Sequence, residues 1–139
     1  MRTTHRCVIV DDDPHFLSFA RTVISELSPR LELIAFESAL EALDFLSGNR
    51  VALIVTDFRM PFVNGFQLTA AVRAVDPKVP IVVMSAEQLG LEAIGRGATA
   101  FASKPDLRTE LRLVFERLGL GSRKRKRMAT APVELELVT

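Results

Sequence analysis

The sequence predicts a single doubly wound α/β domain, because strand-like and helix-like segments alternate five times within about 120 residues. Short apolar runs rich in branched residues are typical of strands that a parallel sheet buries on both faces. These runs lie at residues 6–10, 31–36, 51–57, 80–84 and 99–102. We expect the domain to span residues 1–121, with residues 122–139 as a separate basic tail.

The segments between the predicted strands have the apolar spacing of amphipathic helices. Asp13 and Pro14 favour a helix start, the first as N-cap and the second as a first-turn residue. Helical spacing covers residues 16–27, 39–46, 68–75 and 107–118. A fifth helix over residues 87–96 gives a poor signal, because Gly90 and Gly95 lie inside it and glycine disfavours a helix interior.

The composition is that of a soluble globular protein, with 48% hydrophobic and 25% charged residues in a chain of 139. No apolar run approaches the roughly 20 residues of a membrane helix, and none near the amino terminus resembles a signal peptide. We therefore expect a cytoplasmic protein without a membrane partner. The single Cys7 cannot form an internal disulfide and is expected to be a small buried thiol.

Charge divides the chain into two parts. The net charge is +1, but the tail alone carries +3, from the basic run 123–127 against Glu134 and Glu136, which leaves −2 for the domain. The domain has no electrostatic footprint for nucleic acid, so nucleic acid is not an expected partner. The basic run could bind nucleic acid or an acidic partner, but a solvated linker is favoured because no aromatic residue accompanies it. The tail is therefore predicted to be a linker or a partner-binding extension. Residues 133–138 alternate like a strand that could add to a sheet edge in another copy or a partner, and disorder of this segment is the alternative.

Polar side chains follow four of the predicted strands. The acids Asp11, Asp12 and Asp13 follow the first strand, and Asp57 ends the third. Ser85 and Lys104 follow the fourth and the fifth. Because the carboxyl ends of parallel strands share one edge of a sheet, where such folds bind their ligands, we expect these groups to lie together.

Acids, a hydroxyl and an ammonium at one edge are chemically complementary. Crowded carboxylates repel one another, and a divalent cation held by few oxygen ligands and by water relieves this, which favours Mg²⁺. Ser85 and Lys104 could then hold phosphoryl oxygens while Asp57 acts as the nucleophile. Each residue alone is as often a helix cap, a turn residue or a solvated lysine. Their joint placement at four strand ends favours the functional interpretation.

The segments VIVDDD at 8–13, IVTDFRMP at 54–61, VMSA at 83–86 and FASKP at 101–105 occur in the order found in one family. Over residues 6 to about 119 the chain resembles the receiver domain of two-component response regulators. The resemblance implies a flavodoxin-like five-stranded fold, (βα)5, with strand order 2-1-3-4-5. The resemblance also implies that the chain is not an enzyme but a domain that assists its own phosphorylation and dephosphorylation. The phosphate donor would be a sensor histidine kinase or a phosphotransfer protein, and the partner would be a downstream protein.

The resemblance also implies roles for individual residues. Asp57 would accept phosphate, and Asp12 and Asp57 would bind Mg²⁺ directly together with the backbone carbonyl of Arg59. Asp11 would assist the metal through water. Ser85 and Lys104 would hold the phosphoryl oxygens.

A switch pair is implied as well, in which the Ser85 hydroxyl moves to the phosphate and the Phe101 ring turns inward. The Lys104–Pro105 peptide is expected to be cis, as is usual in this family.

Two features depart from the family pattern. The segment between Ser85 and Gly97 is about three residues short, close to one helical turn, so the fourth helix should be stunted. Because many receivers dimerise through that surface, a homodimer is possible, but the usual dimer geometry is not expected here. Asn64 stands where Asp is common before Gly65, and both residues suit a turn.

Arg59 and Glu87 each lie two residues beyond a site residue, Asp57 and Ser85 respectively. We hypothesise that they pair and shield the phosphoryl group from water. The alternative is a surface ion pair worth under about 1 kcal/mol. His15 follows Pro14 in a first helical turn, where a solvated side chain is expected rather than one turned toward the acids.

Two other functions stay open. A small Mg²⁺-dependent phosphatase would share the chemistry, but haloacid-dehalogenase-like enzymes carry Asp-x-Asp, whereas residue 59 is Arg. An unphosphorylated pseudo-receiver would be an interaction module that works through its basic tail, but it would usually have lost one of the site residues. With about 20 residues after the last helix, no output domain is expected, so the chain is a stand-alone receiver or a fragment of a longer regulator.

Overall fold

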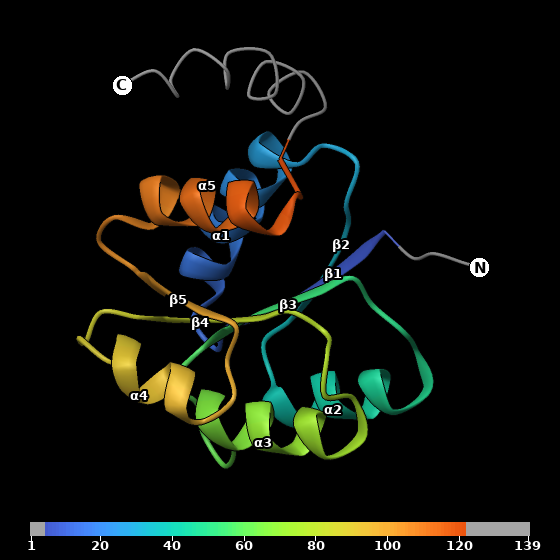
Figure 1. Ribbon diagram of the computed structural model, residues 1–139. Coiled ribbons are helices and arrows are strands. Elements are labelled where there is room, and N and C mark those ends of the chain that lie inside the picture. The colour runs from blue at the N-terminus through green and yellow to red at the C-terminus, as the bar shows by residue number, and fades with distance from the viewer. Residues whose placement is uncertain (1–4, 122–139) are drawn as a thin grey trace, which may run out of the picture.

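The computed structural model describes residues 5–121 and contains one parallel sheet of five strands in the order β2-β1-β3-β4-β5 (Figure 1). The fold class and strand order predicted from the sequence are confirmed. The strands are β1 (Arg6–Val10), β2 (Glu32–Phe36), β3 (Leu53–Asp57), β4 (Ile81–Ser85) and β5 (Ala100–Ser103). The helices are α1 (Pro14–Leu27), α2 (Ala39–Gly48), α3 (Gly65–Val75), α4 (Gly90–Gly95) and α5 (Leu107–Leu118).

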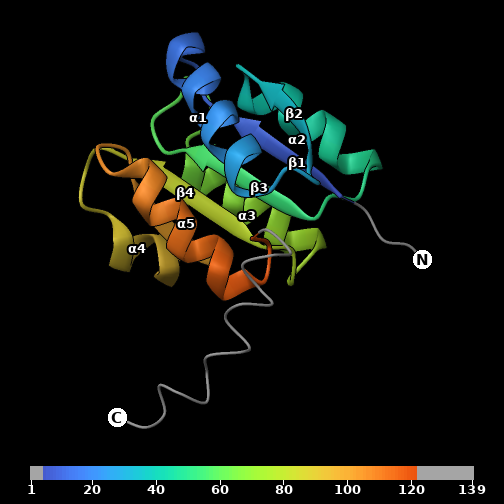
Figure 2. The same cartoon turned by 90° about the horizontal axis from the view of Figure 1, so that it is seen from above.

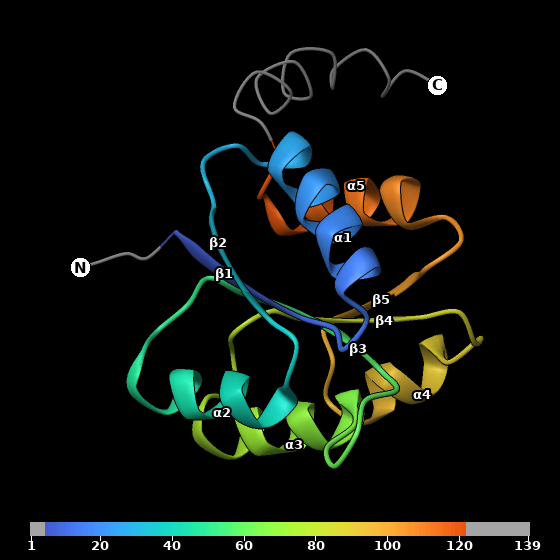
Figure 3. The same cartoon turned by 180° about the vertical axis from the view of Figure 1, so that it is seen from behind.

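The helices cover both faces of the sheet. Helices α1 and α5 lie side by side on one face (Figures 1 and 2), and α2, α3 and α4 form a row on the other (Figure 3). Along β1, Cys7 and Ile9 pack into the core beneath α1 and α5, while Val8 and Val10 pack into the core beneath α2 and α3. Both faces of the central strands are therefore dry, which explains their continuous apolar runs.

Local sequence signals set the helix starts. The Asp13 side chain accepts a hydrogen bond from the His15 amide at 2.9 Å, and Pro14 occupies the first turn of α1, as predicted. At the start of α3, Asn64 and Gln67 form a reciprocal capping box, with both hydrogen bonds at 2.8 Å. Asn64 thus does more here than tolerate a turn, since it fixes the helix that follows the Asp57 loop.

Helix α4 has only six residues, shorter even than the predicted segment 87–96. No side chain caps its amino terminus at Leu89, and Gly97 at φ 104° ends it in the left-handed region that glycine favours. The expectation of a stunted fourth helix is confirmed. Its outward side chains include Leu91, which is 93% exposed.

Several strand boundaries differ from the predicted ones by one or two residues. Strand β3 begins at Leu53 rather than at residue 51, and β5 begins at Ala100 rather than at Thr99. The Thr99 amide still donates to the Ile81 carbonyl at 2.8 Å, and the Thr99 hydroxyl accepts a hydrogen bond from the Ile81 amide at 3.0 Å. Both backbone groups of Ile81 are thus bound by Thr99, the residue just before β5.

The expected cis peptide at Lys104–Pro105 is wrong, because residues 5–121 contain no cis peptide bond. The Leu107 amide donates to the Lys104 carbonyl at 3.2 Å, which places Pro105 at the second position of a turn. The fixed φ of proline suits that position, and trans is the intrinsically preferred isomer of an X-Pro bond.

Arg73, on α3, ties three segments together at the edge of the sheet where the strands begin. Its guanidinium donates hydrogen bonds of 2.7 to 3.2 Å to four oxygens, the carbonyls of Gly97, Asp76 and Val79 and the hydroxyl of Thr99. The end of α3 and the starts of β4 and β5 are therefore joined by one side chain.

Two further expectations bear on the rest of the chain. Cys7 is fully buried, as predicted, and burial raises the pKa of its thiol. None of the helices between residues 5 and 121 has the length and apolar character needed to cross a membrane. The basic run 123–127 and the alternating segment 133–138 lie outside the described residues.

Candidate functional site

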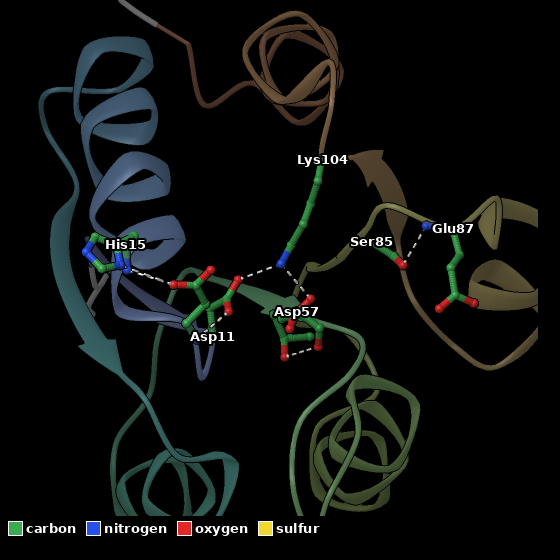
Figure 4. Close-up of polar contacts among 8 residues, drawn as sticks. Asp11, His15, Asp57, Ser85, Glu87 and Lys104 are labelled. Carbon is green, nitrogen blue, oxygen red and sulfur yellow. Dashed lines mark hydrogen bonds and ion pairs between the residues drawn. The ribbon is translucent and has the colours of Figure 1, made fainter.

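Two acids meet at the carboxyl ends of β1 and β3. These strands are neighbours with Val10 opposite Thr56, so Asp11 and Asp57 follow at the same level of the sheet. Asp11 is fully buried, and Asp57 is 6% exposed. Figure 4 shows their carboxylates facing each other across a narrow gap. Acids this well buried need a partner.

Lys104 is that partner. It follows β5, and its side chain descends between the two acids (Figure 4). The Lys104 Nζ atom lies 2.9 Å from Asp11 Oδ2 and 2.9 Å from Asp57 Oδ1. Its backbone amide donates to the Ser85 carbonyl at 2.9 Å, which fixes the start of the side chain. One lysine therefore bridges both acids, a contact to Asp11 that sequence reasoning did not predict.

One cation does not neutralise this pair. Burial raises the pKa of Asp57 to about 6, and the Asp11 charge adds to this against the lowering effect of Lys104. Burial also raises the pKa of Asp11, although the Asp13 amide and Lys104 oppose the shift. Burial by itself lowers the pKa of Lys104. The hydrogen bonds to both acids and their charges together raise it by more, so the net shift of the pKa is upward. The site holds more negative charge than its lysine balances.

The donor set fits a small divalent cation. One carboxylate oxygen from each of Asp11, Asp12 and Asp57 lies within 4.8 Å of the others. All these ligands are hard oxygens, and Asp12 is exposed, so water can complete a coordination shell. The raised pKa values of the two buried acids show that their negative charges are unfavourable here, and a bound cation would relieve this. The residues present therefore suit Mg²⁺.

Ser85, the last residue of β4, is buried at the same edge, but its hydrogen bond points away from the acids. The Ser85 Oγ atom accepts a hydrogen bond from the Glu87 amide at 3.0 Å (Figure 4). A hydroxyl has one donor in addition to its acceptor sites. The Ser85 hydrogen therefore remains for a further acceptor at the site.

Arg59 and Glu87 form the ion pair that the sequence suggested. Arg59 Nε donates to Glu87 Oε2, and the guanidinium also lies over the Phe58 ring, 5.4 Å from its centroid. The hydrogen bond that Arg59 donates to Glu87, together with the charge of that carboxylate, raises the pKa of Arg59. Both side chains are largely exposed. The pair joins the loop after β3 to the loop after β4.

The Phe101 ring is half-buried on the α4 side of β5. It packs against a small apolar cluster of residues from α3, β4 and the segment around α4, namely Phe66, Val83, Ala93 and Ala98. A methyl group added at Gly90 would lie 3.6 Å from the ring, at ordinary contact distance. Phe101 thus links the end of the sheet to the short helix.

Two ring side chains at the start of α1, those of His15 and Phe16, have different surroundings. His15 is turned to solvent, with 98% of its side chain exposed, as expected (Figure 4). Phe16, which its spacing assigned to the core stripe of α1, lies with its ring centroid 4.2 Å from Lys104 Nζ. Sequence reasoning missed this contact, because apolar periodicity does not distinguish a core ring from one at the mouth of a site.

Comparison with known proteins agrees with this geometry. The response regulator receiver domain family matches residues 7–116. The chain is 31% identical over 110 residues to the cyclic di-GMP phosphodiesterase response regulator RpfG of Xanthomonas campestris pv. campestris, covering 76% of this chain and 29% of that protein. It is 36% identical over 120 residues to the transcriptional regulatory protein PrrA of Mycobacterium tuberculosis, covering 78% of this chain and 47% of that protein. The chain thus spans less than half the length of these relatives.

Solved structures show the same fold. The signal receiver domain of the putative response regulator NarL from Mycobacterium tuberculosis superposes with a TM-score of 0.73 at 25% identity, covering 87% of this chain and all of that one. The chemotaxis response regulator CheY4 of Vibrio cholerae gives a TM-score of 0.72 at 24% identity, covering 83% and 98%. With its family match, its fold and its paired acids bridged by a lysine, the chain belongs to the response regulator receiver domains.

Proposed function

We propose that Asp57 is the phosphoacceptor and that a sensor histidine kinase or a phosphotransfer protein is the donor. The observation that carries this proposal is the Lys104 ammonium, 2.9 Å from both buried acids. A carboxylate with a raised pKa beside a fixed cation is a nucleophile next to a group that can hold the transferred charge.

The transfer makes one bond and breaks one. An oxygen of Asp57 attacks phosphorus in line, and the bond from phosphorus to the donor's histidine nitrogen breaks, with its electron pair staying on the imidazole. Lys104 now donates to Asp57 Oδ1, and it would donate to a phosphoryl oxygen after transfer. Asp11 keeps the other side of the ammonium in place.

Mg²⁺ would supply charge neutralisation for the incoming phosphoryl group. Asp12 and Asp57 would hold it directly together with the Arg59 backbone carbonyl, and Asp11 would assist through water. The carboxylate cluster described above supports this assignment. The Arg59 carbonyl rests on the family resemblance alone.

Ser85 and Phe101 are the proposed switch pair. The Ser85 hydroxyl would donate to a phosphoryl oxygen, and the repacking that follows would reach the Phe101 cluster through β4 and β5. The Glu87 amide, which donates to Ser85 Oγ, gives the loop after β4 a direct link to that hydroxyl. The Arg59–Glu87 pair lies across the same loop, and we propose that it limits the access of water to the phosphoryl group.

The proposed output is a change in a protein-binding surface. A downstream protein is the expected partner, and a homodimer would need a geometry that suits the six-residue α4. The proposed domain spans residues 1–121, with residues 122–139 as a linker or partner-binding extension. A cytoplasmic location is part of the same proposal.

Incubation with Mg²⁺ and acetyl phosphate, followed by intact mass measurement, tests the phosphoacceptor role. We expect the mass of one phosphoryl group to be added to the wild-type chain and none to Asp57→Asn. Chelation of the metal should prevent the addition. A folded wild-type chain that gains no mass would remove the proposal, and steady turnover of a phosphate ester would favour the phosphatase instead.

A further inference from the structure

The Phe16 ring stands beside the ammonium at the centre of the site. Phe16 is the third residue of α1, and its ring is partly buried against the core beneath α1 and α5. The Phe19 ring meets it edge-on, with 5.7 Å between centroids. Packing on the core holds the Phe16 ring in place, and its centroid lies 4.2 Å from Lys104 Nζ.

Lys104 has little contact with water at this place. Its side chain is 18% exposed, and two of its three N–H groups are accounted for by Asp11 and Asp57. An aromatic face within about 6 Å attracts a cation, and the attraction grows as water is excluded. Phe16 thus supplies part of the stabilisation that the ammonium loses when it leaves water.

We propose that Phe16 is a positioning residue that holds the Lys104 ammonium over the site while phosphoryl is transferred to Asp57. This inference rests on the proposed function in so far as it concerns transfer. Before transfer, Lys104 is held by the two carboxylates. During transfer, charge moves from Asp57 onto the phosphoryl oxygens, and the ammonium must follow it.

The lysine stem has four flexible carbons, so an ammonium that loses one carboxylate partner can swing toward solvent. The Phe16 ring stands in contact with Nζ, and its attraction does not depend on the charge of Asp57. It therefore narrows the positions open to the ammonium at the moment when Asp57 becomes an acyl phosphate.

Three variants separate the effect of the ring from the effect of its bulk. Phe16→Leu keeps an apolar side chain without a π face, and Phe16→Tyr keeps the face. Phe19→Leu removes the neighbouring ring, which has no contact with Lys104. With Mg²⁺ and acetyl phosphate, we expect phosphorylation about fivefold slower in Phe16→Leu and within about twofold of wild type in the other two.

A coupling test distinguishes positioning from a general loss of structure. If Phe16 acts through Lys104, Phe16→Leu should slow phosphorylation no further in a chain that already carries Lys104→Ala. An equal slowing in both backgrounds, an equal loss in Phe19→Leu, or a wild-type rate in Phe16→Leu would each overturn the proposal. Urea unfolding of each variant ensures that all rates refer to folded protein.

Labelling with an amine-reactive ester gives a readout that needs no phosphorylation. Lys104 should be labelled severalfold faster in Phe16→Leu than in wild type or Phe16→Tyr, with exposed Lys78 as the internal reference. If wild type is not phosphorylated at all, the proposed function fails while this measurement still decides the contact. Unchanged labelling of Lys104 in Phe16→Leu would overturn the inference in either case.

Discussion

The two sides of the site are built differently. On the β1 side, Asp11 and Asp57 are buried, and each lies 2.9 Å from Nζ of the mostly buried Lys104. On the β4 side, Arg59 and Glu87 are largely exposed and lie on loops, next to a six-residue helix without a side-chain cap. The side chains on the β1 side are therefore fixed in one arrangement by their packing. Those on the β4 side are held by few buried contacts.

This difference suggests a division of labour. Preorganised charges suit the chemical step, because they need no rearrangement when charge moves. A loosely held segment suits a change of surface, because a small free energy is enough to shift it. We therefore expect substitutions on the β1 side to affect phosphorylation, and substitutions on the β4 side to affect how long the phosphorylated state lasts and how stable α4 is.

The largest effect should follow loss of the lysine bridge. Lys104→Met removes the donor that both acids share, and phosphorylation by acetyl phosphate should fall by at least about 100-fold. Intact mass measured over time gives the rate. Lys78→Met, at an exposed lysine, is the control and should behave as wild type. A fall of less than about threefold would mean that the β1 side is not where the chemistry is prepared.

Stability without metal should depend on pH through Asp57. Its pKa is about 6 in the folded chain and near 4 when unfolded, so the folded state keeps its proton longer. Stability should therefore fall as pH rises from about 4 to 6, and at pH 7 the loss should be about 1 to 3 kcal/mol. Asp57→Asn should abolish this loss and be the more stable chain at pH 7, as read by urea unfolding.

The same substitution at Asp44, an exposed acid on α2, is the matched control and should change neither stability nor its pH dependence. Added Mg²⁺ should restore much of the wild-type stability at pH 7, because it neutralises the same charge. A wild-type chain whose stability rises steadily from pH 4 to pH 7 in metal-free buffer would contradict the buried-charge account.

On the β4 side, the Arg59–Glu87 pair gives a smaller effect. Arg59→Ala should speed the loss of phosphate from Asp57 by about threefold while leaving phosphorylation nearly unchanged, because water gains access to the phosphoryl group. A phosphate-release assay measures this rate. Arg108→Ala breaks another exposed ion pair, with Glu26 on α1, and serves as control. Equal rates of phosphate release in the wild type and Arg59→Ala would mean that Arg59 and Glu87 form a surface ion pair with no role in shielding the phosphoryl group.

The smallest effect concerns α4 itself. A methyl group at Gly95 would meet nothing within 4 Å, so Gly95→Ala should stabilise the chain by about 0.5 kcal/mol through helix propensity. Gly97→Ala should instead destabilise it, because Gly97 has φ 104° and an added methyl would lie 3.3 Å from Arg73 Cγ. Thermal unfolding of both variants compares them. Destabilisation by Gly95→Ala would show that α4 is more tightly packed than its contacts suggest.

The sequence predicted the fold and most of the site because both follow from strand ends. Asp57 and Lys104 each end or follow an apolar run, and the rule for parallel sheets brings such ends together without knowledge of any contact. The short α4 followed from two glycines and a short segment. Asp13 as a helix cap followed from local chemistry alone.

What the sequence could not predict depends on how distant elements meet. The Phe16 contact with Lys104 requires the placement of α1 against the end of β5, which helical periodicity does not encode. The direct bond from Lys104 to Asp11 depends on a side-chain rotamer. The trans peptide before Pro105 depends on a turn closed by Leu107, whereas the expectation of cis came from the family.

Arg73 gives the sheet a fixed end. Its guanidinium ties the close of α3 to the starts of β4 and β5, at the edge opposite Asp57. Because Arg73 fixes that edge, we expect β4 and β5 to shift little where they begin. Their displacement should be largest at their carboxyl ends, at Ser85 and Lys104. A conformational change that begins at the phosphoryl group would then alter the protein surface close to that group rather than at the opposite edge of the sheet.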